Sequence, residues 1–207
     1  TLAHGWIMPS YPASREIAAM GGIISNNSGG EKTLTYGKTE NYVKSLDVVY
    51  ANGQRDLLRA FSGDELQAKF AEQTEGGRIH REMYQLISEN YDLIMSAKPT
   101  VSKNSSGYYL WNVLNKETGV FDLSKLVVGS QGTLAGVSSA TLTGVIPKTH
   151  SRMLIMFVPS TVHLGDIIVK MLTYKPESIE SYDDHTFKIA IKFFKDIAKK
   201  MGGNMIT

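Results

Sequence analysis

Cysteine is absent from the 207 residues of this sequence. Disulfides, thiolate nucleophiles, cysteine-ligated zinc and iron–sulfur clusters are therefore excluded within the chain, and the absence fits a reducing cytoplasm. Long hydrophobic runs are absent too. No apolar stretch approaches the roughly 18 to 20 residues of a membrane span, so the sequence predicts no transmembrane segment.

An excess of charge of one sign is also missing. The chain has 22 basic and 20 acidic residues and a formal net charge of +2, which is too small to indicate nucleic acid or a membrane surface as partner. Hydrophobic content of 42% and charged content of 20% are ordinary for a globular protein. The length allows one medium domain, or one domain plus part of another. Because the chain starts at Thr1, we expect it to be a piece of a longer protein.

Common catalytic and metal-binding motifs are lacking as well. The five histidines are scattered without metal-ligand spacing, and no Ser-His-Asp order, P-loop lysine motif or dinucleotide G-x-G-x-x-G stands out. The sequence therefore predicts no metal site and leaves the catalytic residues unknown.

Glycine is what the sequence does offer, concentrated in residues 20–37, MGGIISNNSGGEKTLTYG. Glycine can adopt positive φ and lets backbone approach a flat or charged ligand. No Lys or Arg lies between Met20 and Gly30, so backbone N–H groups would hold any anion bound there. The alternative interpretation is a polar surface loop with two turns.

Local patterns predict alternating helices and hairpins around this stretch. Ser14 is a candidate N-cap for a helix over Arg15–Met20, with Gly21 as its stop. Asn52-Gly53 predicts a hairpin of residues 43–51 with 54–60. Ser62 and Glu65 form a candidate capping box for a helix to about Gln73, and Gly76-Gly77 separate it from a second helix on which His80 and Arg81 should face solvent.

The second half predicts a helix at Tyr109–Leu114 and one or two strands within Leu134–Ile146. Pro147–Ser151 is the candidate domain boundary. Beyond it, a strand is expected at Arg152–Val158 and another at Ser178–Tyr182. Helices with apolar faces are expected around Ile167–Leu172 and from Phe187 to Met201.

Several short motifs occur in one order along the chain. They are Pro9, Pro12 and Ser14; Gly21-Gly22, Asn27 and Gly29-Gly30; Tyr36-Gly37, Thr39 and Val43; Asn52-Gly53; and VGSQGTLAGV at 128–137. In this order they resemble the flavin-binding domain of FAD-linked oxidases, the vanillyl-alcohol-oxidase or PCMH-type flavoproteins, in the branch of D-lactate dehydrogenase, glycolate oxidase and D-2-hydroxyglutarate dehydrogenase.

The resemblance implies an α+β fold. Residues 1–147 would form the second subdomain of a PCMH-type FAD-binding domain, a mainly antiparallel sheet with flanking helices. Residues 148–207 would begin an α+β substrate or cap domain. The family's first FAD subdomain and the end of its cap have no counterpart in this sequence, so we expect the isolated chain to be inactive.

The implied cofactor is FAD. The implied reaction is oxidation of a D-2-hydroxy acid such as D-lactate by hydride transfer to flavin N5, with electrons passed to a quinone, cytochrome, flavoprotein or oxygen. We expect a cytoplasmic protein and leave open peripheral membrane association of the parent. Residues expected at the cofactor are Pro12, Ser14, Gly21, Gly22, Asn26, Asn27, Ser28, Gly29, Gly30, Tyr36, Gly136 and Val137.

One position departs from the family pattern. Gln131 occupies a place where the family usually has Glu, which keeps side-chain size but loses the charge. Two alternatives to the main hypothesis remain. The chain could be a non-catalytic folded module with an incomplete flavin pocket, or part of a flavoenzyme of the same superfamily with other chemistry, such as reduction of enolpyruvyl sugars or formation of ether lipids.

Overall fold

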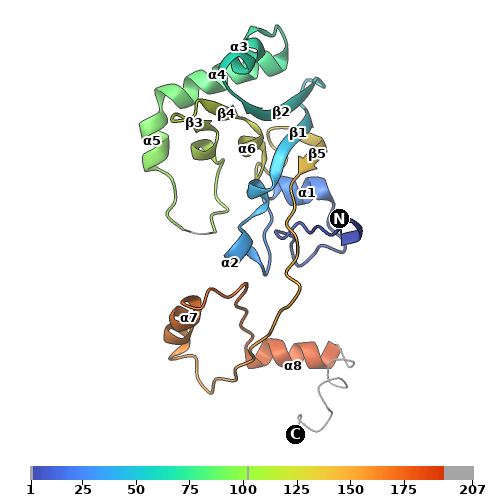
Figure 1. The fold of residues 1–207 in the computed structure, drawn as a ribbon, viewed down its shortest axis with the longest axis vertical. Coiled ribbons are helices and arrows are strands. Elements are labelled where there is room, and N and C mark those ends of the chain that lie inside the picture. The colour runs from blue at the N-terminus through green and yellow to red at the C-terminus, as the bar shows by residue number, and fades with distance from the viewer. Residues whose placement is uncertain (1, 102, 194–207) are drawn as a thin grey trace.

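A computed structural model describes residues 2–101 and 103–193. It contains a five-stranded antiparallel sheet in the order β3-β4-β2-β1-β5, with several helices packed against it, whereas the two helices beyond residue 160 lie away from the sheet (Figure 1). This confirms the predicted α+β class with a mainly antiparallel sheet. The strands are β1 (Val43–Val49), β2 (Arg55–Phe61), β3 (Leu114–Asn115), β4 (Val120–Asp122) and β5 (Gly136–Leu142).

The helices are mostly short. The α-helices are α1 (Met20–Ser25), α2 (Thr33–Tyr36), α3 (Gly63–Ala71), α4 (Glu75–Glu89), α5 (Tyr91–Ser96), α6 (Ser124–Val127), α7 (Leu164–Leu172) and α8 (Asp184–Phe193). Three single-turn 3₁₀ helices lie at Leu2–His4, Thr39–Asn41 and Leu110–Asn112. None of the helices in the described ranges is long and apolar enough to cross a membrane.

The β1–β2 hairpin forms where the Asn-Gly pair predicts it. Gly53 has a φ of +83°, a value that glycine adopts without strain, and its N–H donates to the carbonyl of Tyr50 at 2.9 Å. β5 pairs with the other edge of β1, so β1 lies between β2 and β5 in the sheet. Of the one or two strands expected within Leu134–Ile146, the structure has one, β5.

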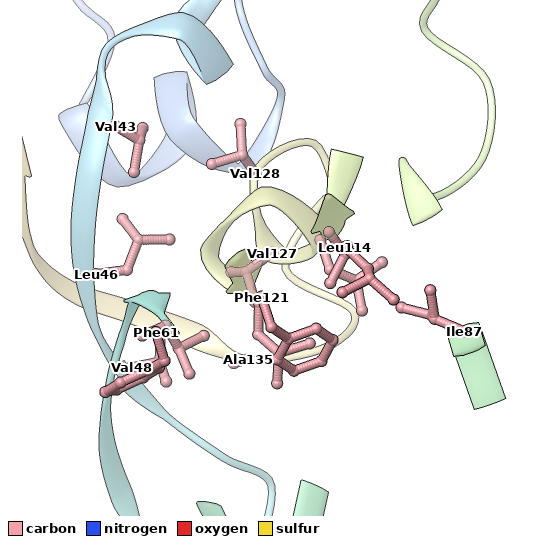
Figure 2. Packing of buried hydrophobic residues seen from close by; sticks show 14 of the residues in the cluster. Val43, Leu46, Val48, Phe61, Ile87, Leu114, Phe121, Val127, Val128 and Ala135 are labelled. Atoms are coloured by element: carbon pink, nitrogen blue, oxygen red, sulfur yellow. The ribbon is translucent and has the colours of Figure 1, made fainter. Parts of the chain in front are cut away.

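The core lies on the face of the sheet that the helices cover. Leu46, Val48 and Leu58 point to this face from β1 and β2 and are almost fully buried. Figure 2 shows Phe121 of β4 beside them, with Ile87 of α4 nearby. The opposite face carries Asp47 and Leu57, which are exposed. Burial of this alternating apolar set fixes the strand register, because a one-residue shift would turn every core side chain outward.

Helix α4 corrects two predictions. Gly76 and Gly77 do not separate two helices but lie in the first turn of α4, where Thr74 caps the Gly77 N–H at 3.1 Å. A side chain at Gly76 would meet the carboxylate of Asp56, so close packing requires glycine there. His80 was expected on the surface and is instead fully buried, between the rings of Phe61 and Phe121.

The helix expected at Arg15–Met20 is also wrong. The chain there forms turns, and α1 begins at Met20 and contains both Gly21 and Gly22. Two apolar residues explain the shift, because Ile23 and Ile24 on α1 are buried. Tertiary burial of two isoleucines outweighs the roughly 1 kcal/mol that each glycine costs in a helix.

Beyond Pro147 the structure contains helices but no strand among the described residues. α7 and α8 confirm the two predicted apolar helices, although the end expected at Met201–Gly202 lies outside the described residues. The strands expected at Arg152–Val158 and Ser178–Tyr182 are wrong, because neither segment has a neighbouring strand to pair with in the described part of the chain. The division into two domains stays a prediction.

One set of contacts joins this second region to the first. Glu177 lies 2.8 Å from the Lys32 ammonium and 3.5 Å from that of Lys148. The hydroxyl of Thr35 on α2 donates to the backbone carbonyl of Pro176 at 3.3 Å. The hydrogen bond with Lys32 contributes most to a pKa of Glu177 below its ordinary value. The segment after α7 therefore lies against the second half of the glycine-rich stretch.

Candidate functional site

The two glycine-containing segments, around 21–30 and 129–137, lie side by side. Gly129 N–H donates to the Ile24 carbonyl at 3.1 Å, and Gln131 N–H donates to the Ser25 carbonyl at 2.8 Å. The side-chain amide of Gln131 also donates to Asn26 Oδ1 at 3.1 Å. These bonds join the end of α1 to the chain leading into β5, although the segments are about a hundred residues apart in sequence.

Asn27 occupies the centre of this junction. It has a φ of +44° and is buried, which Asn tolerates better than most residues. Its Oδ1 accepts a hydrogen bond from Glu40 N–H at 2.9 Å, while Nδ2 is buried without a hydrogen-bond partner among the described residues. Gly129 (φ +86°) approaches so closely that a Cβ there would lie 3.2 Å from the Asn27 Cβ.

The second glycine pair is needed for packing within the protein itself. A Cβ on Gly29 would lie 2.6 Å from Thr33 Oγ1, and one on Gly30 would overlap the carbonyl oxygen of Tyr11. Gly30 thereby brings the stretch against Tyr11 and Pro12. Ser28 is buried, and its carbonyl accepts hydrogen bonds from both the N–H and the hydroxyl of Thr39. Packing and hydrogen bonds within the protein therefore account for these residue types at Ser28, Gly29 and Gly30 without a ligand.

The first glycine pair is open. Gly22 is exposed, and a Cβ on it would meet no atom within 4 Å. A Cβ on Gly21 would lie 3.7 Å from the Val137 carbonyl oxygen, so the start of α1 lies against the start of β5. Gly136 is exposed and Val137 half-buried. Gly21, Gly22, Gly136 and Val137 therefore form a small backbone-lined surface that a flat ligand could reach.

Ser14 and Tyr36 lie where the chain turns before and after α1. Ser14 is exposed, and its carbonyl accepts from Ile17 N–H at 2.9 Å and Ala18 N–H at 3.0 Å, so it closes a turn and caps no helix. Tyr36 ends α2, and its carbonyl accepts from the hydroxyl of Tyr42 at 2.8 Å. These backbone contacts place both residues in turns, and neither contact involves the surface formed by Gly21 and Val137.

Sequence reasoning missed Lys38, which follows Gly37 in the Y-G-x-T motif. Lys38 is buried, and its ammonium donates to the carbonyl of Asn104 at 2.6 Å. The Lys38 side chain also packs against Gly29, because a Cβ added there would lie 3.4 Å from the Lys38 Cγ. Lys38 therefore connects the glycine-rich stretch to Asn104. The only signal in the sequence was its position between two motif residues, where the family pattern allows any residue.

The described residues supply no evident base or metal ligand set. His4, His150, His163 and His185 are exposed, and His80 lies in the core, where burial lowers its pKa. No group of three or more His, Asp or Glu side chains in the described ranges could hold a metal ion.

A flavin ring fits the open surface in chemical terms. The ring system needs backbone that approaches closely and neutral hydrogen-bonding groups, and the surface offers two glycines without Cβ crowding. Asn26 at its border is exposed and donates to Ser28 Oγ at 3.1 Å.

Comparison with known proteins supports the same assignment. Residues 1–56 match a family model described as an FAD binding domain. The chain is 34% identical over 130 residues, 60% of its length, to D-2-hydroxyglutarate dehydrogenase of Escherichia coli. It is 26% identical over 198 residues, 93% of this chain, to glycolate oxidase subunit GlcD of Bacillus subtilis. It is 30% identical over 139 residues, 67% of this chain, to D-lactate dehydrogenase of Archaeoglobus fulgidus.

The chain spans only 12%, 30% and 19% of the lengths of these three relatives, respectively. The matched family model identifies FAD as the cofactor. Together, the ordered glycine motifs, the antiparallel sheet and these similarities show that the chain belongs to the FAD-linked oxidase family.

Proposed function

We propose that this chain forms one wall of the FAD site in an enzyme that oxidises a D-2-hydroxy acid. The observation that carries the proposal is the junction of the two glycine segments, made by the Gly129–Ile24, Gln131–Ser25 and Gln131–Asn26 hydrogen bonds. The first of these segments lies within the residues that match an FAD binding domain.

The part of this chain in the reaction is binding and orientation. FAD, when bound, accepts the hydride from the substrate α-carbon. Gly21 and Gly22 leave room for the ring to approach the backbone of α1, and the Val137 carbonyl borders the same surface. Of the residues expected to contact the cofactor, four form the open surface, namely Gly21, Gly22, Gly136 and Val137, and Asn26 at its border is exposed. We infer that these contact the ring, whereas Asn27, Ser28, Gly29 and Gly30 shape the loop.

The substrate class rests on the names of the relatives. They are called dehydrogenases of D-2-hydroxyglutarate and D-lactate and an oxidase of glycolate, which are all 2-hydroxy acids. D-Lactate and D-2-hydroxyglutarate are therefore the first two substrates to test. The electron acceptor and a cytoplasmic location remain parts of the proposal.

The test is FAD binding by two matched glycine variants. Gly22 and Gly165 both lie in helices, both lack a positive φ, and neither would place a Cβ within 4 Å of another atom. Both Gly22→Val and Gly165→Val should therefore keep the fold. Titration of FAD, followed by quenching of flavin fluorescence, should show binding weakened about tenfold or more by Gly22→Val alone, a loss of about 1.4 kcal/mol.

Equal FAD affinity in the two variants would refute the assigned wall. A folded, colourless chain that takes up no FAD, either alone or within a longer polypeptide that contains it, would favour the rival hypothesis of a non-catalytic module.

A further inference from the structure

A small pocket lies behind the glycine-rich stretch, on the side where Lys38 leaves it. Its volume is about 260 Å³, enough for a small organic acid. Lys98, Pro99, Val101 and Asn104 line one part of the pocket, and the stacked rings of Tyr109 and Trp111, with centroids 5.1 Å apart, contribute to the rest of its lining. Its polar lining comes from Lys38, Glu40, Lys98, Asn104 and Asn112.

Lys38 brings a buried positive charge to this pocket, and the nearby Glu40 offsets it in part. Only 9% of the residue is exposed, and its ammonium is bound by two neutral acceptors, the Asn104 carbonyl at 2.6 Å and Ser105 Oγ at 3.3 Å. Among the described residues, no carboxylate lies within 4 Å of it. Burial lowers the pKa of Lys38, as expected for a cation removed from water without an ion-pair partner. An ammonium has three donors, so one N–H is left to bind a ligand.

The neighbouring charges add to this excess. Lys98 lines the same pocket, and Lys103 is close enough that its charge helps to lower the pKa of Lys38. Glu40 is the acidic residue in the lining. Its carboxylate accepts a hydrogen bond from Asn112 Nδ2 at 3.2 Å, and burial raises its pKa. Two lysines therefore line a space that contains one carboxylate, with Lys103 nearby, and the excess of positive charge favours an anion.

We propose that this pocket binds a small organic carboxylate, with Lys38 as its principal ligand. The third N–H of Lys38 would donate a charge-assisted hydrogen bond to the carboxylate, which is stronger than a bond between neutral groups. The aromatic lining suits the carbon skeleton of an organic acid better than it suits a fully hydrated inorganic anion. The site is separate from the glycine surface proposed for the flavin, and it requires no flavin to be present.

Trp111 allows the binding to be observed directly. The chain has two tryptophans, so Trp6→Phe leaves Trp111 as the single reporter. This protein is titrated with D-lactate, glutarate and sulfate at constant ionic strength, and tryptophan fluorescence is recorded. We expect saturable binding of the carboxylates with a Kd on the order of 1 mM, weakened about tenfold or more by Lys38→Met.

Two further lysine variants make the test independent of folding defects. Lys98 is exposed, so Lys98→Met should preserve the fold and still weaken binding a few-fold, because it removes one of the pocket's cations. Lys116 lies over the ring of Tyr91 at 4.1 Å, is not in the pocket lining, and its replacement by Met should change nothing. Circular dichroism of each variant verifies the fold.

Three outcomes would overturn the proposal. They are no saturable response to any carboxylate, unchanged affinity in folded Lys38→Met, and sulfate binding as tight as that of the carboxylates. The last would show a general anion site. Because the titration contains no FAD, each result stands whether or not the flavin proposal survives.

Discussion

Replacement by alanine should change the thermal stability of the protein in opposite directions at two glycines of the same stretch. Gly30 faces the backbone of Tyr11, where a Cβ would overlap the carbonyl oxygen and lie 3.3 Å from its carbon. Neither this carbonyl nor the adjoining Pro12 can rotate away as a flexible side chain could. Gly22 lies in α1, where a Cβ would meet no atom within 4 Å.

The magnitudes follow from these environments. Overpacking of this kind costs about 1 to 3 kcal/mol, so Gly30→Ala should lower the thermal midpoint of a chain this size by about 2 to 12 °C. Alanine at Gly22 removes backbone entropy from the unfolded chain and favours a helix, which is worth about 0.5 to 1 kcal/mol. Gly22→Ala should therefore raise the midpoint by about 1 to 4 °C.

Thermal unfolding followed by circular dichroism at 222 nm, a wavelength that reports helix content, measures both effects in one buffer. If Gly30→Ala unfolds at the same temperature as the wild type, or if Gly22→Ala is destabilised as much as Gly30→Ala, the close approach of Gly30 to Tyr11 is wrong.

Two further predictions concern buried titratable residues, Lys69 of α3 and His80 of α4. Lys69→Met should lower the free energy of unfolding in urea by about 3 to 5 kcal/mol, because it leaves buried Asp56, 2.7 Å from the Lys69 ammonium, without its ion-pair partner. Lys44→Met, at an exposed position, is the control. An equal loss of stability in both variants would contradict the role of the pair. Burial lowers the pKa of His80, so between that value and about 6.5 the unfolded chain binds more protons, and stability should fall as pH drops below about 6.5. His80→Gln should flatten this dependence between pH 7.5 and 5.5, and an unchanged slope would show that other groups cause it.

The sequence predicted the parts of the fold that depend on short-range chemistry. The Asn52-Gly53 turn positioned a hairpin because few residues accept the backbone angles of such a turn. The apolar faces of α7 and α8 were visible as helical periodicity. The motif order also led to the family. The residues expected at the cofactor come from two glycine-containing segments, which the hydrogen bond from Gln131 N–H to the Ser25 carbonyl joins.

Errors arose where tertiary contacts overrode local preference. Gly76 and Gly77 suggested a break, but the close approach of Asp56 and Glu72 makes them necessary inside α4. His80 fell off the apolar stripe by periodicity, yet Phe61 and Phe121 enclose it. The polar partners of Lys38 come from a loop more than sixty residues away, and no local pattern could have indicated them.

The most direct test of the flavin assignment is amide NMR of the isotope-labelled chain during titration with FAD. Shift changes should concentrate on the backbone N–H groups of residues 21–26 and 129–137, since these segments border one surface. Residue-resolved shifts detect even weak binding and identify the surface that the cofactor touches. Changes confined to other parts of the chain, or no change at saturating FAD, would contradict a flavin wall built from these two segments.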